Sequence, residues 1–87
     1  MPSMRIAAIV FRDLEDALKA GGADIVIAVE NPSEAITHIE NIIREKKADL
    51  ILVDDKIVAR IGKGKLKEIK YKYPVPAIVE LETQNRK

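Results

Sequence analysis

The sequence of 87 residues is 47% hydrophobic and 33% charged, a balance typical of a single globular domain and not of a disordered chain. It has no cysteine, which excludes disulfide bonds and thiolate metal sites, and no apolar run approaches the roughly 18 residues of a membrane helix. The net charge is +1, but residues 12–55 contain 11 acidic and 5 basic residues, whereas residues 56–73 contain 1 acidic and 7 basic residues.

Four short apolar runs predict β-strands, at residues 4–10, 24–29, 49–53 and 77–81. The first three do not alternate between apolar and polar residues. A strand that is apolar on both faces belongs in a parallel sheet with helices on both sides.

Two segments between these runs have the spacing of amphipathic helices. In the first, Asp13 is the expected N-cap, and Gly21 or Gly22 ends the helix. In the second, Asn31 is the expected cap and Pro32 the first helical residue, with Glu34 completing a capping-box pattern. The second helix then carries a regular apolar stripe of Ala35, Ile36, Ile39, Ile42 and Ile43.

The segment from residue 54 to residue 73 predicts a third helical region, capped by Asp54 or Asp55. A continuous helix of this length would run about 30 Å, much longer than a five-residue strand. We therefore expect a break between Gly62 and Lys65, where two glycines weaken the helix.

These elements predict an α/β fold with a four-stranded parallel sheet in the order 2-1-3-4 and helices on both faces, a Rossmann-like or receiver-like three-layer sandwich. Residues 1–87 form one domain, with a frayed tail at residues 82–87. The last strand is then an edge strand, which accounts for the two prolines before it, because an edge strand needs fewer N–H donors.

No arrangement of residues predicts a catalytic, cofactor-binding or metal site. There is no Gly-rich phosphate loop. Asp54 and Asp55 suggest the phosphate acceptor of a receiver domain, but the acidic pair that such a domain needs follows its first strand. His38 and Ser33 lack the partners that a metal site or a nucleophile requires.

The basic segment that follows is the best candidate for a binding surface. Its lysines could contact phosphates and its tyrosines could stack on bases, as in a small nucleic-acid-binding module. The same residues fit an acidic protein partner. The sequence pI of about 8.0 is low for a dedicated nucleic-acid binder. The residues that form this segment are Lys63, Lys65, Lys67, Lys70, Tyr71, Lys72 and Tyr73.

Three stretches of the chain resemble the small F subunit of archaeal A-type and V-type rotary ATPases. They are "MRIAAIV" at residues 4–10, "VENPSEAITHIENIIREKKADLILVDDKIVARI" at residues 29–61, and "YPVPAIVEL" at residues 73–81. The turn after the first strand departs from the family pattern, because Val10 and Phe11 stand where the family usually has Gly and Asp.

The resemblance implies a non-catalytic subunit of the central stalk, or rotor. Such a protein binds the coiled-coil D subunit of the stalk and, through it, the catalytic A/B head, and so couples ATP synthesis or hydrolysis to proton or sodium transport. It implies a cytoplasmic protein, peripheral to the membrane, that is a monomer when isolated and takes no cofactor and no nucleic acid. The residues expected at the partner interface are Lys63, Lys65, Lys70, Tyr71, Tyr73, Pro74, Val75 and Pro76.

Overall fold

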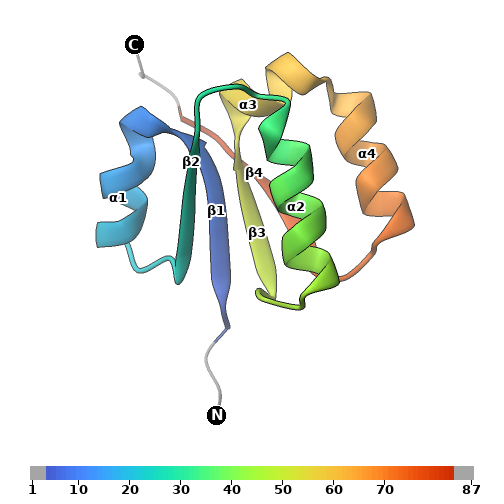
Figure 1. The fold of residues 1–87 in the computed structure, drawn as a ribbon, viewed down its shortest axis with the longest axis horizontal. Coiled ribbons are helices and arrows are strands. Elements are labelled where there is room, and N and C mark those ends of the chain that lie inside the picture. The colour runs from blue at the N-terminus through green and yellow to red at the C-terminus, as the bar shows by residue number, and fades with distance from the viewer. Residues whose placement is uncertain (1–3, 84–87) are drawn as a thin grey trace.

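The structure is a computed structural model that describes residues 4–83. Helices and strands alternate along the chain in the predicted order (Figure 1). None of the described helices is both long enough and apolar enough to cross a membrane. The elements are β1 (Ile6–Phe11), the 3-10 turn η1 (Arg12–Leu14), α1 (Glu15–Ala20), β2 (Ile25–Val29), α2 (Glu34–Arg44), β3 (Leu50–Asp54), α3 (Asp55–Ile61), α4 (Lys63–Lys72) and β4 (Ala77–Leu81).

The four strands form one parallel sheet in the order β2-β1-β3-β4, which confirms the predicted fold class and strand order. In the centre, Ala8 of β1 pairs with Val26 of β2 on one side and with Leu52 of β3 on the other. The direction of the crossovers reverses between β1 and β3, and the carboxyl ends of these two strands are where sheets of this kind place their ligands.

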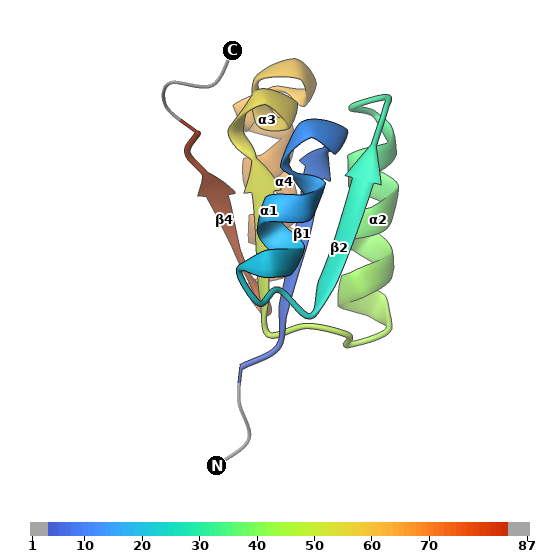
Figure 2. The same cartoon turned by 90° about the vertical axis from the view of Figure 1, so that its left-hand side faces the viewer.

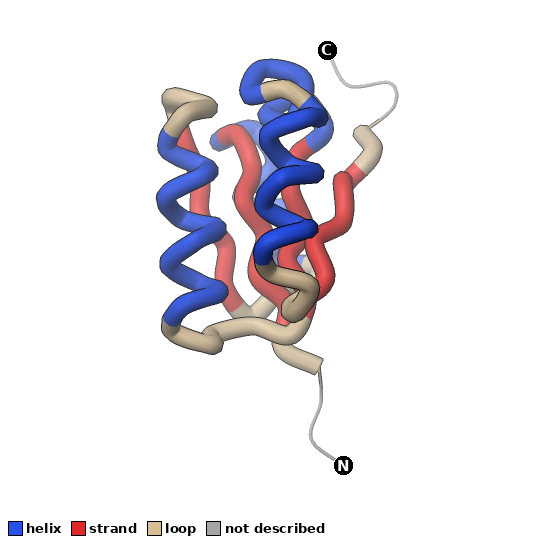
Figure 3. Tube along the Cα trace, turned by 90° about the vertical axis from the view of Figure 1, so that its right-hand side faces the viewer, coloured by secondary structure: helices blue, strands red, loops and turns tan. Residues whose placement is uncertain are grey.

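Helices cover both faces of the sheet, but they cover them unequally. α2 and α4 lie next to each other over one face (Figure 3), where Ile9, Ile39 and Ile51 are fully buried in the main core. α1 alone packs on the other face, against β1 and β2 (Figure 2). Strand alternation points Val79 of β4 to this second face, and its side chain is 46% exposed.

The prediction that Asp13 caps the first helix is wrong. Residues Arg12–Leu14 continue directly from β1 as a 3-10 turn, and α1 begins only at Glu15, with no side-chain cap. Asp13 therefore lies inside a turn rather than in front of a helix.

The start of α2 agrees with the prediction in part. The side-chain oxygen of Asn31 accepts hydrogen bonds from the N–H of Ser33 at 3.1 Å and from its hydroxyl at 2.9 Å. The α-helix itself begins at Glu34, later than Pro32. Its apolar stripe is confirmed: Ala35, Ile39, Ile42 and Ile43 are buried, and Ile36 is half-buried.

The predicted break in the third helical region lies at Gly62, between α3 and α4. Gly62 has a φ of +93°, which an L side chain adopts only with strain. The break turns the chain from the carboxyl end of the sheet, where α3 lies, back along the face that α4 covers (Figure 1). Val58 before the break and Leu66 and Ile69 after it all reach the same core.

Pro74 and Pro76 both lie in the connection between α4 and β4. α4 ends at Lys72, and β4 begins at Ala77, so neither proline has to donate a hydrogen bond within the sheet. β4 is an edge strand, as predicted. The edge position is nevertheless unnecessary to explain the prolines, because they stand outside the strand.

Within the stretch predicted as a frayed tail, residues 82–87, Thr83 contacts the start of α3. Its N–H and hydroxyl donate hydrogen bonds to the carboxylate of Asp55, at 3.2 Å and 2.7 Å. Residues 84–87 lie outside the described part of the chain.

The two glycines around the break should respond to alanine in opposite ways. A β-carbon at Gly62 or Gly64 would meet no atom within 4 Å, so conformation alone decides the effect. Gly62→Ala should lower the free energy of unfolding by about 1 kcal/mol because of the positive φ, and Gly64→Ala, inside α4, should raise it by about 0.5–1 kcal/mol. Urea denaturation of the two variants checks this, and equal effects would contradict the position of the break.

Candidate functional site

The carboxyl ends of β1 and β3 are joined by Asp54, the last residue of β3, whose side chain is fully buried. Its Oδ2 accepts a hydrogen bond from the N–H of Phe11 at 3.0 Å, at the end of β1. Its Oδ1 accepts one from the N–H of Lys56 at 2.9 Å, in the first turn of α3. One carboxylate therefore links two strands and caps a helix, and Asp54 is the predicted cap.

The neighbouring Asp55 contacts the chain just beyond β4. Its two carboxylate oxygens accept hydrogen bonds from the N–H and the hydroxyl of Thr83. A phosphate-accepting aspartate has to be open to the incoming phosphoryl group. Asp54 is enclosed, and Asp55 holds the chain after β4. This geometry favours structural roles for both residues. Within residues 4–83, no group of three or more His, Asp or Glu side chains is placed to hold a metal ion.

His38 and Ser33, the other polar residues that a metal site or a nucleophile could use, have no catalytic partner beside them in the described part of the chain. His38 lies half-buried on α2, beside a hollow of about 320 Å³ that Ile25 and Ile27 of the edge strand β2 also line. The hydroxyl of Ser33 donates to Asn31 at the start of α2. Neither arrangement provides a general base beside a nucleophile.

The lysines expected at the interface lie on two different flanks of α4. Leu66 and Ile69 face the core. Lys65 lines a groove together with Ile36 of α2, so its flank faces α2. A helix turns about 100° per residue, which places residues 63, 67 and 70 on the opposite flank, away from α2.

We call Lys63, Lys67, Lys70 and Tyr71 the α4 outer face. All four are exposed. In the part of the chain that the structure describes, none of these three lysines forms an ion pair, whereas Lys65 lies 3.6 Å from Glu68. The outer face is therefore a row of available positive charges beside an aromatic side chain.

The tyrosines, the prolines and Val75, all expected at the interface, differ in their exposure to solvent. Tyr71 is 92% exposed, Val75 is 79% exposed, and Pro74 is exposed. Tyr73 instead packs half-buried against the core, where the Lys72 ammonium lies 5.4 Å from its ring centre, and Pro76 is buried. Helical periodicity predicts this position for Tyr73, which continues the stripe of Leu66 and Ile69, seven residues after the buried Leu66.

A hollow of about 370 Å³ lies beside Val75 at the amino ends of the strands. Ile43, Ala48 and Pro76 form its apolar lining. At its rim, the main-chain N–H of Arg5 donates to Asp49 at 2.8 Å, and this bond, with help from the Arg5 guanidinium, lowers the pKa of Asp49. An exposed valine next to an apolar hollow is suited to receive apolar side chains of another protein.

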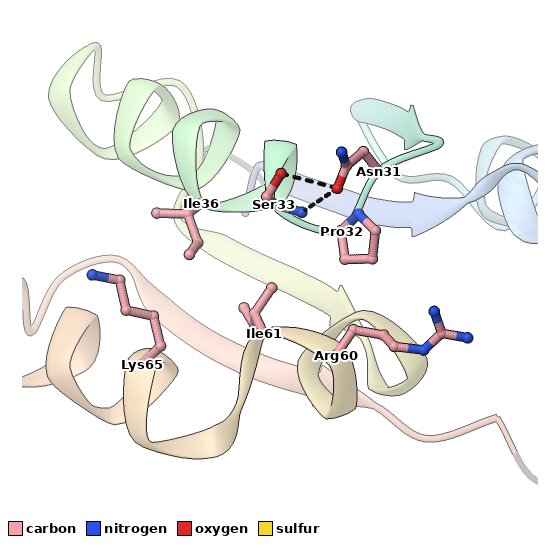
Figure 4. Close-up of a pocket in the computed structure, with 7 residues that line it drawn as sticks. All are labelled: Asn31, Pro32, Ser33, Ile36, Arg60, Ile61 and Lys65. Carbon is pink, nitrogen blue, oxygen red and sulfur yellow. Dashed lines mark hydrogen bonds between the residues drawn. The ribbon is translucent and has the colours of Figure 1, made fainter.

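A third concave surface, which sequence analysis missed, lies between α2 and the junction of α3 with α4 (Figure 4). Its volume is about 440 Å³. Periodicity places Ile36 and Ile61 on apolar stripes but does not show that the two helices leave them half-covered. The residues that line this groove are Asn31, Pro32, Ser33, Ile36, Arg60, Ile61 and Lys65.

Comparisons with known proteins give only a local likeness. No protein family matches the chain, and no solved structure matches it. The chain is similar to FR901469 synthetase of Dothideomycetidae sp. (strain 11243), with 47% identity over 45 residues. These residues are 52% of this chain but, to the nearest per cent, 0% of the synthetase, so the likeness covers a minute part of that protein.

The structural role of Asp54 can be tested by substitution. Asp54→Ala leaves two partly buried N–H groups, those of Phe11 and Lys56, without this acceptor, beside the cavity of the lost carboxylate. The free energy of unfolding should fall by about 1–3 kcal/mol, because a buried donor without a partner costs about 1–3 kcal/mol and these two donors are only partly buried. Urea denaturation measures the loss, and Asp16→Ala, at an exposed position on α1, is the control that should change little. A stable Asp54→Ala variant would show that these bonds are dispensable.

Proposed function

We propose that this chain is a non-catalytic central-stalk component of a rotary ATPase, equivalent to the F subunit of A-type and V-type enzymes. It binds the coiled-coil D subunit and turns with it, while the A/B head carries out ATP synthesis or hydrolysis. In this role it is a cytoplasmic protein, peripheral to the membrane. The resemblance of the three sequence stretches motivates the proposal, and the fold agrees with that resemblance.

The observation that carries the proposal is the exposure of Tyr71 and Val75 around the end of α4. Side chains that are 92% and 79% exposed contribute little to the stability of the isolated chain. Tyrosine at a protein surface is a frequent anchor of interfaces, since it buries a large area and keeps a polar tip. Val75 adjoins the hollow at the amino ends of the strands, which extends the apolar area.

The charges on α4 give this surface a preferred kind of partner. Lys63, Lys67 and Lys70 follow one flank, with Tyr71 beside them. Such a row attracts a partner whose facing surface is acidic and speeds its association. We therefore expect the D subunit to present carboxylates along the segment that meets α4.

A second candidate is a nucleic-acid-binding module, which the same row of lysines and the exposed Tyr71 would favour. Against it, the described surface offers one strongly exposed tyrosine rather than a series on which bases could stack. The two candidates differ in their response to salt, because binding that depends on phosphate contacts weakens steeply as salt is raised.

The proposal predicts a stable 1:1 complex with the cognate D subunit, measured by co-purification and isothermal titration calorimetry. The double variant Tyr71→Ala/Val75→Ala should weaken this complex by at least about tenfold, because truncating central apolar anchors commonly costs about 1–2 kcal/mol each. Both positions are exposed, so the variant should keep its fold, which circular dichroism checks.

Val79→Ala is the matched control, since it shortens an exposed valine on the opposite face of the sheet. It should leave the affinity for the D subunit unchanged. Absence of a complex with wild-type protein would contradict the proposal. Binding of single-stranded DNA or RNA at about 0.15 M salt, lost as salt is raised, would favour the second candidate.

A further inference from the structure

We propose that the groove between α2 and the α3–α4 junction is a second docking surface, and that its occupant is an acidic amphipathic helix of a partner protein. The groove lies at the carboxyl end of the sheet, on the flank of α4 that faces α2 (Figure 4). It is separate from the α4 outer face and from the hollow beside Val75, so this inference goes beyond the binding of the D subunit.

The floor of the groove is apolar. Ile61, at the end of α3, points toward Pro32 and Ile36 at the start of α2 (Figure 4). Ile36 and Ile61 are both half-buried and pack against the main core. A volume of about 440 Å³ has room for apolar side chains of a helix laid across it, and burying this floor would favour binding.

The charged residues that line the groove are both positive. Lys65 and Arg60 extend toward its opposite ends (Figure 4), and no acidic residue is part of the lining. Arg60 forms no ion pair within the described residues, and the Lys65–Glu68 pair is long, at 3.6 Å, and exposed. Exposed pairs of this kind contribute little, so a carboxylate of the partner can replace Glu68 at small cost.

The N–H groups at the start of α2 do not make this groove a phosphate site. The N–H of Ser33 donates to the Asn31 side chain, and those of Glu34 and Ala35 donate to main-chain carbonyls at 3.0 Å. The positive charge comes from two long side chains on either side of an apolar floor. A helix with apolar residues on one face and acidic residues flanking them complements this pattern, whereas a nucleic acid would find no aromatic side chain in the lining.

The test uses a synthetic capped helical peptide, with leucines at positions i, i+4 and i+7 and glutamates on both sides of that stripe. Binding to the ¹⁵N-labelled protein is followed by amide chemical shifts. The largest changes should map to Ser33, Ile36, Ile61 and Lys65, which line the groove. Arg60→Glu/Lys65→Glu should weaken binding by at least about tenfold, and a peptide with glutamine in place of glutamate should bind similarly weakly.

The matched control is Lys19→Glu/Arg44→Glu, which replaces one lysine and one arginine at exposed positions outside the groove, changes the net charge equally and should bind the peptide as the wild type does. Ile36→Ser should also weaken binding, and this variant measures the contribution of the apolar floor to affinity separately from that of the charges. The proposal is overturned if the peptide does not bind, if its shifts map to the α4 outer face, or if an oligonucleotide displaces it from the groove. Because the D subunit is absent from this experiment, its outcome is independent of the proposed function.

Discussion

The carboxylate of Asp54 is the contact on which the arrangement of the carboxyl end depends. It binds the N–H of Phe11 at the end of β1 and the N–H of Lys56 in α3, and it is fully buried. In a parallel sheet these strand ends lie at the usual site of ligands. Here the acidic group at that position serves the fold, which explains why an acidic sequence after β3 need not indicate phosphate chemistry.

The course of the chain through α3 and α4 determines which side chains of the basic segment face α2 and which face away from it. Asp54 caps the start of α3, and the helix ends before Gly62, whose positive φ turns the chain into α4. Because α4 then lies beside α2 (Figure 3), one of its flanks lines a groove with α2 and the other faces away from α2. Lysines near the break and along α4 are therefore distributed over two surfaces, one on each flank, although they form a single basic segment in the sequence. The two proposals assign a different partner to each of these surfaces.

The sequence was sufficient to predict the elements, the parallel sheet and its order, because uninterrupted apolar runs and the stripe of α2 are strong local signals. It also located the break at Gly62. It was wrong about Asp13, since a 3-10 turn and a capped helix begin with similar residues. It also assigned Tyr73 and Pro76 to the exposed partner interface, whereas Tyr73 is half-buried against the core and Pro76 is buried. The groove with Arg60 and Ile61 could not be predicted, because it depends on how closely two helices distant in sequence approach each other.

Hydrogen exchange of the complex with the D subunit would test the central claim most directly, because it reports on each part of the chain at once. The account predicts slower exchange on binding in α4 and at the main-chain N–H of Val75, which is the one amide hydrogen in residues 74–76. It predicts unchanged exchange in α1 and β2, at the far side of the sheet. Protection confined to α1 and β2, with α4 unaffected, would contradict the assignment of α4 as the partner-binding surface.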